Sequence, residues 1–249
     1  MKMANSIIRK LIPEKVYDSL VLIIKYSGWR YACPCCNGRF RKLKPAGQDK
    51  KRENAQCPKC GSMERHRLLI LYLRNKTRFF QDKLKVLDIA PMDFFQKLCK
   101  SSQNLDYTSA DMESPLAMMH FDISEIPLPD NSFDCIICYH VLEHVPDDTK
   151  AMKELYRVLK PGGWAILQVP IDQSREKTFE DPSVTSPEER LKLFGQKDHV
   201  RIYGVDYKNR LENAGFKVRL DTYLSELSVD DKERYRLPQK EDIHFCIKQ

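Results

Sequence analysis

Four of the nine cysteines stand in a spacing that suits a metal ion. Cys33 and Cys36 form one C-x2-C pair, and Cys57 and Cys60 form a second pair after 20 intervening residues. Each pair can direct two thiolates at one ion, and two pairs complete the tetrahedron that structural zinc prefers. Free thiols would leave this stretch, which has few apolar residues, without a core. The spacing therefore predicts a structural zinc site, with Cys35 outside it.

Acidic side chains at predicted strand ends form a second candidate site. The turn after Asp88 contains no glycine, whereas a phosphate-binding loop needs glycine so that backbone amides can approach the ligand. S-adenosylmethionine has no phosphate and relaxes this demand. Asp88 could serve its ammonium group, Asp111 could accept both ribose hydroxyls, and Asp122 with Ile123 suits the edge and face of adenine.

Hydrophobic periodicity predicts the elements that position these acids. Buried strands are expected at residues 85–90, 107–110, 133–138, 164–169, 216–223 and 242–248. Helices are expected at residues 93–100, 147–159 and 205–214. Alternation of strands and helices predicts an α/β fold with a doubly wound, mostly parallel sheet covered on both faces. In such sheets ligands bind at the carboxyl ends of the strands.

Three segments carry a family resemblance: "CPKCGSMERHRLL" from Cys57, "FDCIICYHVLEHV" from Phe133, and "ELYRVLKPGGWAILQVP" from Glu154. With "VLDIAP" and "FEDPSVTSPEERLKLFGQKDHVRIYG", they resemble class I S-adenosylmethionine-dependent methyltransferases, in a bacterial subgroup with an N-terminal zinc-binding head. The resemblance covers about residues 84 to 220. It implies a Rossmann-like, seven-stranded sheet whose last strand is antiparallel. The family's glycine-rich first turn is missing here.

The resemblance also implies roles for individual residues. Asp88 and Ala90 would line the methionine end of the cofactor. Asp111 and Met112 would hold the ribose, and Asp122 and Ile123 the adenine. Tyr139 would lie under the sulfonium.

A long insert at residues 172–203 is expected to form a lid over the acceptor. We expect His199 from this insert to act as the general base, with His140 as the second candidate, because an ordinary imidazole can take a proton near neutral pH. Arg201 would orient a polar or anionic acceptor, and Asp181 would also contact it.

The triplet His140, Glu143 and His144 offers a different chemistry. If this stretch is helical, the three side chains share one face and could bind a divalent ion. The alternative is that Glu143 and His144 only tie the helix start to neighbouring loops.

The residues that follow the fourth predicted strand disfavour two classes of acceptor. After the fourth strand the chain reads Cys138-Tyr139-His140. It lacks the Asn/Asp-Pro-Pro-aromatic run of exocyclic-amine nucleic-acid enzymes and the Pro-Cys pair of cysteine-dependent pyrimidine enzymes. The resemblance to the bacterial subgroup implies a small-molecule or saccharide-type hydroxyl acceptor instead. Two alternatives remain: an RNA methyltransferase, or a non-catalytic binding protein whose altered turn has lost the cofactor.

The charge is distributed unevenly along the chain. Residues 1–85 contain 21 Lys and Arg against 6 Asp and Glu, whereas residues 86–249 contain 21 against 29. A basic head suggests an anionic partner, and RNA phosphates are one candidate. Solvated lysines around a small module are the other interpretation.

The N-terminal segment is expected to be helical. Residues 6–26 predict two helical pieces split at Pro13, with an apolar stripe that either packs on the protein's own core or lies on a membrane surface. The absence of a signal or membrane-spanning segment and the nine cysteines predict a reducing cytoplasm. The expected divisions are a helical segment (1–30), a zinc module (31–66), a connecting helix (67–83) and a methyltransferase domain (84–249).

Overall fold

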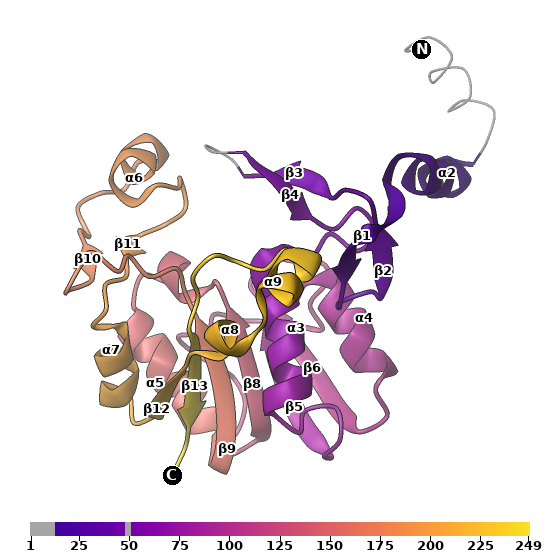
Figure 1. The fold of residues 1–249 in the computed structure, drawn as a ribbon. Coiled ribbons are helices and arrows are strands. Elements are labelled where there is room, and N and C mark those ends of the chain that lie inside the picture. Colours follow the sequence, from indigo (N-terminus) through magenta and orange to yellow (C-terminus); the bar gives the residue numbers. More distant parts are fainter. Residues whose placement is uncertain (1–12, 48–50) are drawn as a thin grey trace. The chain divides into compact units, whose positions relative to one another are not determined.

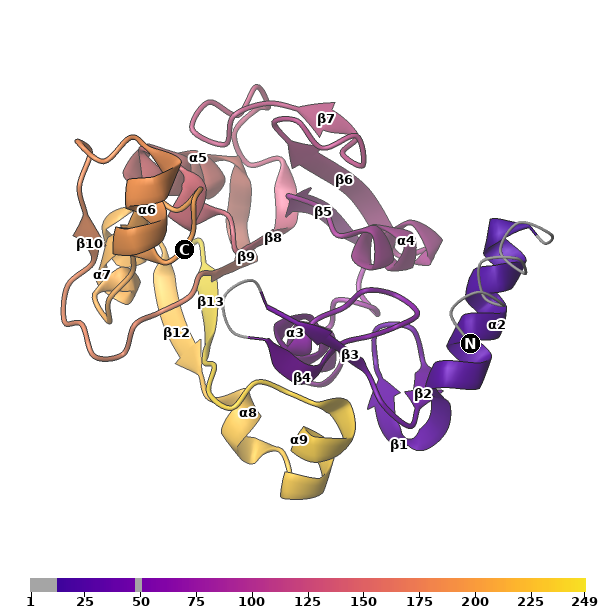
Figure 2. The ribbon, with the colours of Figure 1, turned by 90° about the horizontal axis from the view of Figure 1, so that it is seen from above.

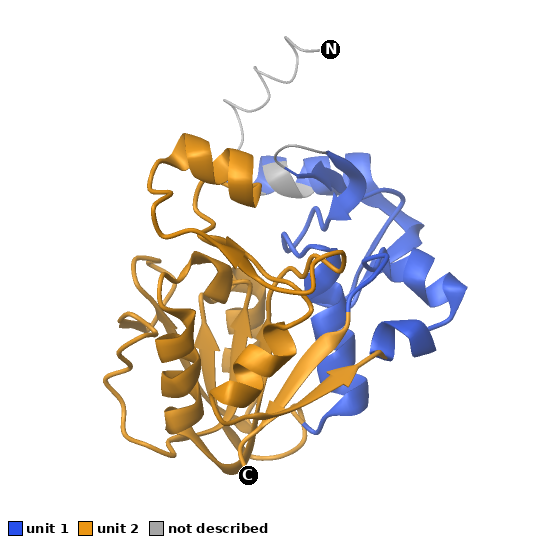
Figure 3. Ribbon diagram, turned by 90° about the vertical axis from the view of Figure 1, so that its left-hand side faces the viewer, with its two compact units in different colours: residues 1–78, 223–241 blue, residues 79–222, 242–249 orange. Residues whose placement is uncertain are grey.

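The computed structural model describes residues 13–47 and 51–249. Within these residues the chain forms two compact units, which are described separately (Figure 3). Unit 1 contains residues up to 78 and residues 223–241, and unit 2 contains residues 79–222 and 242–249. This division differs from the predicted one, because residues 223–241 were assigned to the methyltransferase domain. The predicted helical piece before Pro13 lies outside the described residues.

Unit 2 is built on a single seven-stranded sheet. The strands are β5 (Leu84–Ile89), β6 (Leu105–Asp111), β7 (Met119–His120), β8 (Phe133–Tyr139), β9 (Leu159–Gln168), β12 (Lys217–Asp221) and β13 (Ile243–Ile247). Their order in the sheet is β12-β13-β9-β8-β5-β6-β7. β13 runs antiparallel to both neighbours, and the strands from β9 to β7 are parallel. The predicted Rossmann-like sheet with an antiparallel last strand is therefore confirmed.

Helices cover both faces of this sheet, as the strand–helix alternation predicted. The helices of unit 2 are α4 (Asp93–Ser101), η1 (Leu142–His144), α5 (Asp148–Val158), α6 (Pro187–Phe194) and α7 (Tyr207–Asn213). In Figure 2, α5 and α7 lie on one face of the sheet and α4 on the other. The core between α5, α7 and the sheet contains Leu155, Val158, Leu167, Tyr207 and Leu211, all fully buried. Their burial holds the strands in register.

The insert at residues 172–203 has structure of its own. It contains β10 (Phe179–Glu180), α6 and β11 (Arg201–Ile202), and β10 pairs with β11 in antiparallel fashion. Ser186 caps α6 by accepting a hydrogen bond from the Glu189 amide, and Gly195 ends the helix in the left-handed conformation. Figure 1 shows the insert at one end of the sheet.

Unit 1 combines short strands with four helices among its described residues. They are α2 (Glu14–Tyr26), β1 (Ser27–Cys33), β2 (Gly38–Phe40), β3 (Lys44–Ala46), β4 (Arg52–Gln56), α3 (Glu64–Lys76), α8 (Tyr223–Glu226) and α9 (Val229–Tyr235). β1 pairs with β2 and β3 pairs with β4. These two hairpins carry the two C-x2-C pairs at their ends.

Within the described ranges, none of the helices combines the length and the apolar character needed to cross a bilayer.

Candidate functional site

The turn after β5 has a backbone that ordinarily requires glycine. Ala90 has φ of 54°, in the left-handed region, and its amide donates to the carbonyl of Ala110 over 2.8 Å. L-residues rarely adopt this conformation because Cβ crowds the neighbouring carbonyl. The glycine is therefore missing from the sequence, but the glycine-type turn is present at Ala90. Ile89 pairs with Ala110, so this turn leaves the sheet beside the end of β6.

Asp88 lies one residue before the end of β5 and is closed off from solvent. Its side chain is 1% exposed, and Oδ2 accepts a hydrogen bond from the Tyr107 hydroxyl over 2.5 Å. Burial raises the pKa of the Asp88 carboxyl to about 7, against the opposing effect of the tyrosine bond. The sequence did not single out Tyr107. Its position in a predicted strand next to the one that bears Asp88 was the only signal available.

Asp111 ends β6, as predicted, and stays partly accessible. Its Oδ1 accepts the amides of Glu113 and Ser114, both over 2.8 Å. A carboxylate offers two oxygens with about four acceptor positions, so these turn bonds leave capacity for a diol. Met112 follows with 63% of its side chain exposed. An accessible acid beside an exposed apolar side chain suits a ribose and the adjoining adenine.

The predicted adenine and sulfonium residues lie in different environments. Asp122 is exposed, and its Oδ1 accepts the Ser124 amide over 2.7 Å. Ile123 is 5% exposed and belongs to the core of unit 2. Tyr139 ends β8 and is 7% exposed, with its ring centroid 5.2 Å from that of His140. β8 pairs with β5, so Tyr139 ends the strand next to the Ala90 turn.

Four ionisable side chains gather beyond the end of β8. His140 has φ of 60°, and its Nδ1 lies 3.1 Å from Glu143 Oε1. The rings of His144 and His199 meet edge to face with centroids 4.8 Å apart. Ligand atoms of Glu143, His144 and His199 all lie within 4.8 Å of one another. The group of three therefore differs from the predicted triplet: it contains His199 from the insert, whereas His140 stands before the helical turn η1 and contacts Glu143 alone among the three.

The insert is fastened to this cluster through its last residues. The Val200 amide donates to the Glu143 carbonyl over 3.0 Å. His199 is 6% exposed, and burial lowers the pKa of its imidazole below the ordinary 6.5. His199 is therefore neutral at physiological pH, as either a proton acceptor or a metal ligand must be.

Arg201 and Asp181 have partners that differ from the predicted ones. The Arg201 guanidinium is 3% exposed and donates to the carbonyls of Leu142, Val145 and Pro146 and to Glu180. These bonds use most of its five donors, so Arg201 fixes the loop after β8 instead of facing an acceptor. Asp181 Oδ1 accepts from the amide and hydroxyl of Ser183. The acceptor-binding roles predicted for both residues find no support in these contacts.

The cysteines of unit 1 form the predicted cluster. Sγ of Cys33 lies 3.6 Å from that of Cys60, and Sγ of Cys36 lies 3.7 Å from that of Cys57. A tetrahedral zinc site with Zn–S bonds of about 2.3 Å separates its sulfur atoms by about 3.8 Å. The four thiols therefore fit zinc. Cys35 is not one of the four clustered cysteines, and its Sγ donates to the His66 carbonyl.

A buried arginine supports this cluster and was missed in the sequence. Arg67 is fully buried, and its guanidinium donates to the carbonyls of Ala55, Ser62, Tyr235 and Arg236. The only sequence signal was a basic residue at the start of an apolar helix. Met63 occupies the N-cap position of α3, and the hydroxyl of the preceding Ser62 lies 3.2 Å from Sγ of both Cys33 and Cys60.

Comparison with known proteins was made for the whole chain. Residues 77–167 match a family model described as "Methyltransferase domain". A demethylmenaquinone methyltransferase of Listeria monocytogenes is 37% identical over 75 residues, which are 30% of this chain and 31% of that protein. A probable S-adenosylmethionine-dependent methyltransferase of Mycolicibacterium smegmatis is 31% identical over 132 residues, 51% of this chain and 47% of that protein.

Among solved structures, a SAM-dependent methyltransferase from Archaeoglobus fulgidus is 19% identical with a TM-score of 0.48, covering 73% of this chain and 93% of that one. The chain spans between about a third and a half of the length of the curated relatives it matches. The segment that matches the methyltransferase family model, residues 77–167, includes β5, β6, β8 and most of β9.

Proposed function

We propose that the chain is an S-adenosylmethionine-dependent methyltransferase acting on a hydroxyl of a small-molecule or saccharide-type acceptor. The observation that carries the proposal is that Ala90 and Asp111 both lie at the carboxyl ends of adjacent strands, directly after the paired residues Ile89 and Ala110. Ala90 supplies a tight left-handed turn, and Asp111 supplies an accessible carboxylate one strand away. This is the edge of a doubly wound sheet at which nucleoside ligands bind. The segment that matches the methyltransferase family model, residues 77–167, covers all of these residues.

Different residues at this edge of the sheet would contact different parts of the cofactor. Asp111 and Met112 would hold the ribose, and Asp122 and Ile123 the adenine. Asp88 and Ala90 would lie at the methionine end, and Tyr139 next to the sulfonium. The cofactor supplies an activated methyl group, and the protein mainly aligns the two reactants and excludes water.

A hydroxyl acceptor also needs a group that takes its proton. His199 and His140 are the two candidates that the cluster beyond β8 provides. His199 is neutral because burial lowers its pKa. His140 bonds Glu143 through Nδ1, and since a carboxylate can only accept, the remaining Nε2 of a neutral ring would carry the lone pair. Once an acceptor is known, loss of the base should lower turnover by about 10²–10⁴-fold.

Titration calorimetry with S-adenosylhomocysteine tests the cofactor site. Asp111→Ala should weaken binding by about 1.5–3 kcal/mol, the range for a hydrogen bond to a charged group. Asp111→Asn is the gentler variant, because its amide oxygen can still accept the amides of Glu113 and Ser114. Asp106→Ala is the matched control: Asp106 is an exposed acid near the opposite end of the same strand. Absence of binding to the unaltered protein would favour the non-catalytic alternative.

The acceptor class has its own test against the RNA alternative. Binding of RNA through phosphates would weaken steeply as salt concentration rises. Saturable, steeply salt-dependent RNA binding, together with methylation of that RNA, would replace the hydroxyl acceptor proposed here.

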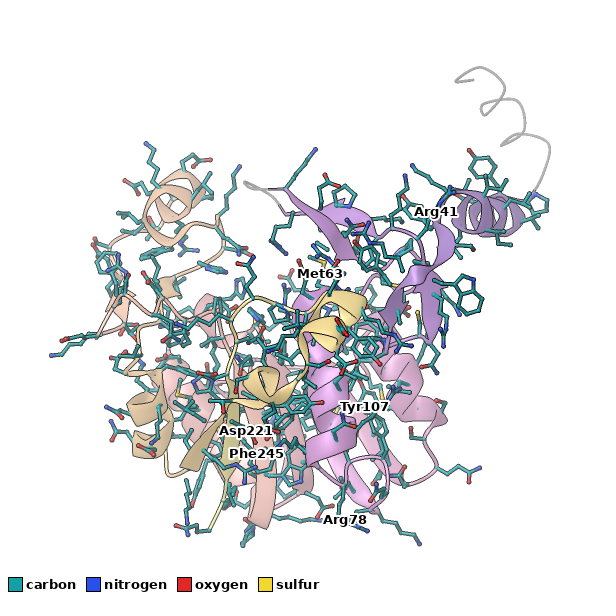
Figure 4. The ribbon with its side chains drawn as sticks, in the orientation of Figure 1. Arg41, Met63, Arg78, Tyr107, Asp221 and Phe245 are labelled. Carbon is teal, nitrogen blue, oxygen red and sulfur yellow. The ribbon has the colours of Figure 1, made fainter. Side chains whose placement is uncertain are left out.

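We also propose that α2 rests on an anionic membrane surface. Its apolar side chains Val16, Leu20, Ile23 and Ile24 are between 43% and 72% exposed. Because these four side chains are exposed, they do not pack on the protein's own core, which was the other interpretation of the stripe. Trp29 follows, 80% exposed, with the Arg39 guanidinium 4.9 Å from its ring. Arg41 donates to the carbonyls of Ile24 and Lys25 at the end of α2 (Figure 4).

This chemistry is that of a helix lying in the interface of a bilayer, with apolar side chains on one face and cations around it. None of the nine cysteines forms a disulfide, which agrees with a reducing compartment, and we propose the cytoplasmic side of the membrane.

A further inference from the structure

We propose that Glu143, His144 and His199 bind a divalent transition-metal ion, separate from the four-cysteine site. Each of the three offers one ligand atom, and these atoms lie within 4.8 Å of one another. They come from two segments far apart in the sequence: η1, directly after β8, and the end of the 172–203 insert. The proposal rests on the proposed methyl transfer only for its catalytic consequence, because ion binding is a property of the site itself.

The first argument is a carboxylate oxygen that needs a partner. Glu143 is 2% exposed, and within the described residues its Oε2 is buried without a hydrogen bond. Leaving a buried carboxylate oxygen unsatisfied costs at least the desolvation of that atom. A cation coordinated by Oε2 removes this cost, and the imidazoles of His144 and His199 lie within reach of the same ion.

The second argument is the set of hydrogen bonds behind the ligands. Glu143 Oε1 is 3.1 Å from His140 Nδ1, so the other carboxylate oxygen is the one left for an ion. His144 Nδ1 lies 3.2 Å from the Asp198 carbonyl and 3.3 Å from its carboxylate, which holds the proton on Nδ1 and leaves Nε2 for the ion. A ligating histidine whose second nitrogen bonds an acid or carbonyl is the usual arrangement around a metal.

The third argument is that the scaffold of the cluster is rigid. Arg201 ties the carbonyls of Leu142, Val145 and Pro146 together and forms an ion pair with Glu180 over 2.9 Å. The backbone bond from Val200 to Glu143 fixes the two ligand segments to each other. The ligands are therefore held before any ion arrives, which lowers the cost of assembling the site.

Two imidazoles and one carboxylate suit Zn²⁺, Mn²⁺, Fe²⁺, Co²⁺ or Ni²⁺ better than Mg²⁺ or Ca²⁺, which prefer oxygen ligands. Three protein ligands also leave coordination positions open, as in sites that bind a substrate oxygen. In the proposed reaction a hydroxyl bound there would lose its proton more readily. The alkoxide oxygen would then form the bond to the methyl carbon as the carbon–sulfur bond breaks, leaving the thioether. His199 would then serve as a ligand, and His140 would take the proton.

The test uses the full chain carrying one zinc per chain and no excess, so that the four thiolates are occupied and zinc does not compete with the added ion at the Glu143, His144 and His199 site. Mn²⁺ is titrated and its unbound fraction is measured by electron paramagnetic resonance. We expect one Mn²⁺ per chain in the unaltered protein, and at least a tenfold weaker affinity in Glu143→Gln and in His199→Ala. His120→Ala, which alters an exposed histidine on β7, should bind as the unaltered protein does.

Binding of S-adenosylhomocysteine is measured on the same samples and separates the two proposals, and circular dichroism shows that each variant is folded. Retained binding of S-adenosylhomocysteine with no Mn²⁺ bound to the unaltered protein would overturn the metal site and leave the proposed function standing. The same holds if both variants bind Mn²⁺ unchanged. Mn²⁺ bound by the unaltered protein and lost in both variants, without any binding of S-adenosylhomocysteine, would support the metal site and refute the proposed function.

Discussion

The hydroxyl of Tyr107 on β6 lies 2.5 Å from Oδ2 of Asp88 on the adjacent strand β5. Figure 4 labels Tyr107 among the strands of unit 2. The bond favours the ionised carboxylate, but burial opposes it more strongly and raises the pKa of Asp88 to about 7. Asp88 therefore exchanges a proton at physiological pH, directly beside the Ala90 turn.

This pKa predicts how stability depends on pH. The folded pKa of about 7 lies above the ordinary 3.8, so between these values the folded state holds a proton that the unfolded state has lost. The contribution of Asp88 to stability is thus complete below about pH 4 and declines until about pH 7. Asp88→Asn stays neutral and should be more stable than the unaltered protein at pH 8, by up to about 4 kcal/mol. Urea unfolding at pH 5 and pH 8 checks this; an equal effect at both values would contradict it.

The same group predicts a pH dependence of cofactor binding. If Asp88 serves the ammonium of the cofactor, only its ionised form attracts that charge. The affinity for S-adenosylhomocysteine should then rise as pH increases through about 7 and level off above it. Calorimetry between pH 6 and pH 8 measures this, with Asp88→Asn as the control in which the rise disappears. A flat profile in the unaltered protein would place the ammonium away from Asp88.

The Ala90 turn predicts a stabilising substitution. An L-residue in the left-handed conformation costs about 1–2 kcal/mol, whereas glycine adopts it freely at an entropic cost of about 0.5–1 kcal/mol. Ala90→Gly should therefore raise the free energy of unfolding by up to about 1 kcal/mol. Ala214→Gly is the matched control, because Ala214 has φ of −79° and gains nothing from glycine. A fall in thermal midpoint for both variants would show that Ala90 is not strained.

The centre of the sheet could be predicted because β5 and β8 are buried along most of their length and contain apolar runs. The six predicted strands correspond to β5, β6, β8, β9, β12 and β13, although β9 begins at Leu159, before the predicted start. β7, β10 and β11 have two residues each and carry no periodicity to detect. Residues 223–241 belong to unit 1 through long-range contacts such as the bonds from Arg67 to the carbonyls of Tyr235 and Arg236. A local sequence pattern does not predict such contacts.

Residues of the candidate site could be placed from the sequence where they stand at the end of a predicted strand. Asp111 and Tyr139 stand at strand ends, as expected. His199 could be named from its residue type, but its neighbours Glu143 and His144 depend on how the insert folds back. Arg201 was expected to orient an acceptor because its guanidinium can bind a polar or anionic group. Its burial against three carbonyls is a tertiary effect beyond sequence reasoning.

The exposed stripe of α2 predicts binding to anionic vesicles. Sedimentation with vesicles containing phosphatidylserine should carry down the protein, and phosphatidylcholine vesicles should carry down much less, because the cations add about 1 kcal/mol each near an anionic surface. Ile24→Glu, at the residue of α2 that is 72% exposed, should release it. Val229→Glu changes an 80% exposed residue of α9 and is the control. Equal loss in both variants would argue against α2 as the contact.

The four-cysteine site predicts one zinc per chain that depends on Cys57 and not on Cys35. Cys57→Ser removes one corner of the tetrahedron, and a serine hydroxyl is a poor replacement for a thiolate as a zinc ligand. Zinc measured by elemental analysis should fall well below one per chain, and unit 1 should become sensitive to protease, because binding energy of the ion is folding energy for a small module. Cys35→Ser is the matched control, since its Sγ faces the His66 carbonyl. Full zinc in Cys57→Ser would refute the site, and loss of zinc in Cys35→Ser would show that the set of ligands is wrong.

Arg67→Met tests the same site without changing a cysteine: it keeps the four thiols but removes a buried cation near the negatively charged cluster. It should lower zinc affinity and destabilise unit 1, because the carbonyls of Ala55 and Ser62 lose their donor.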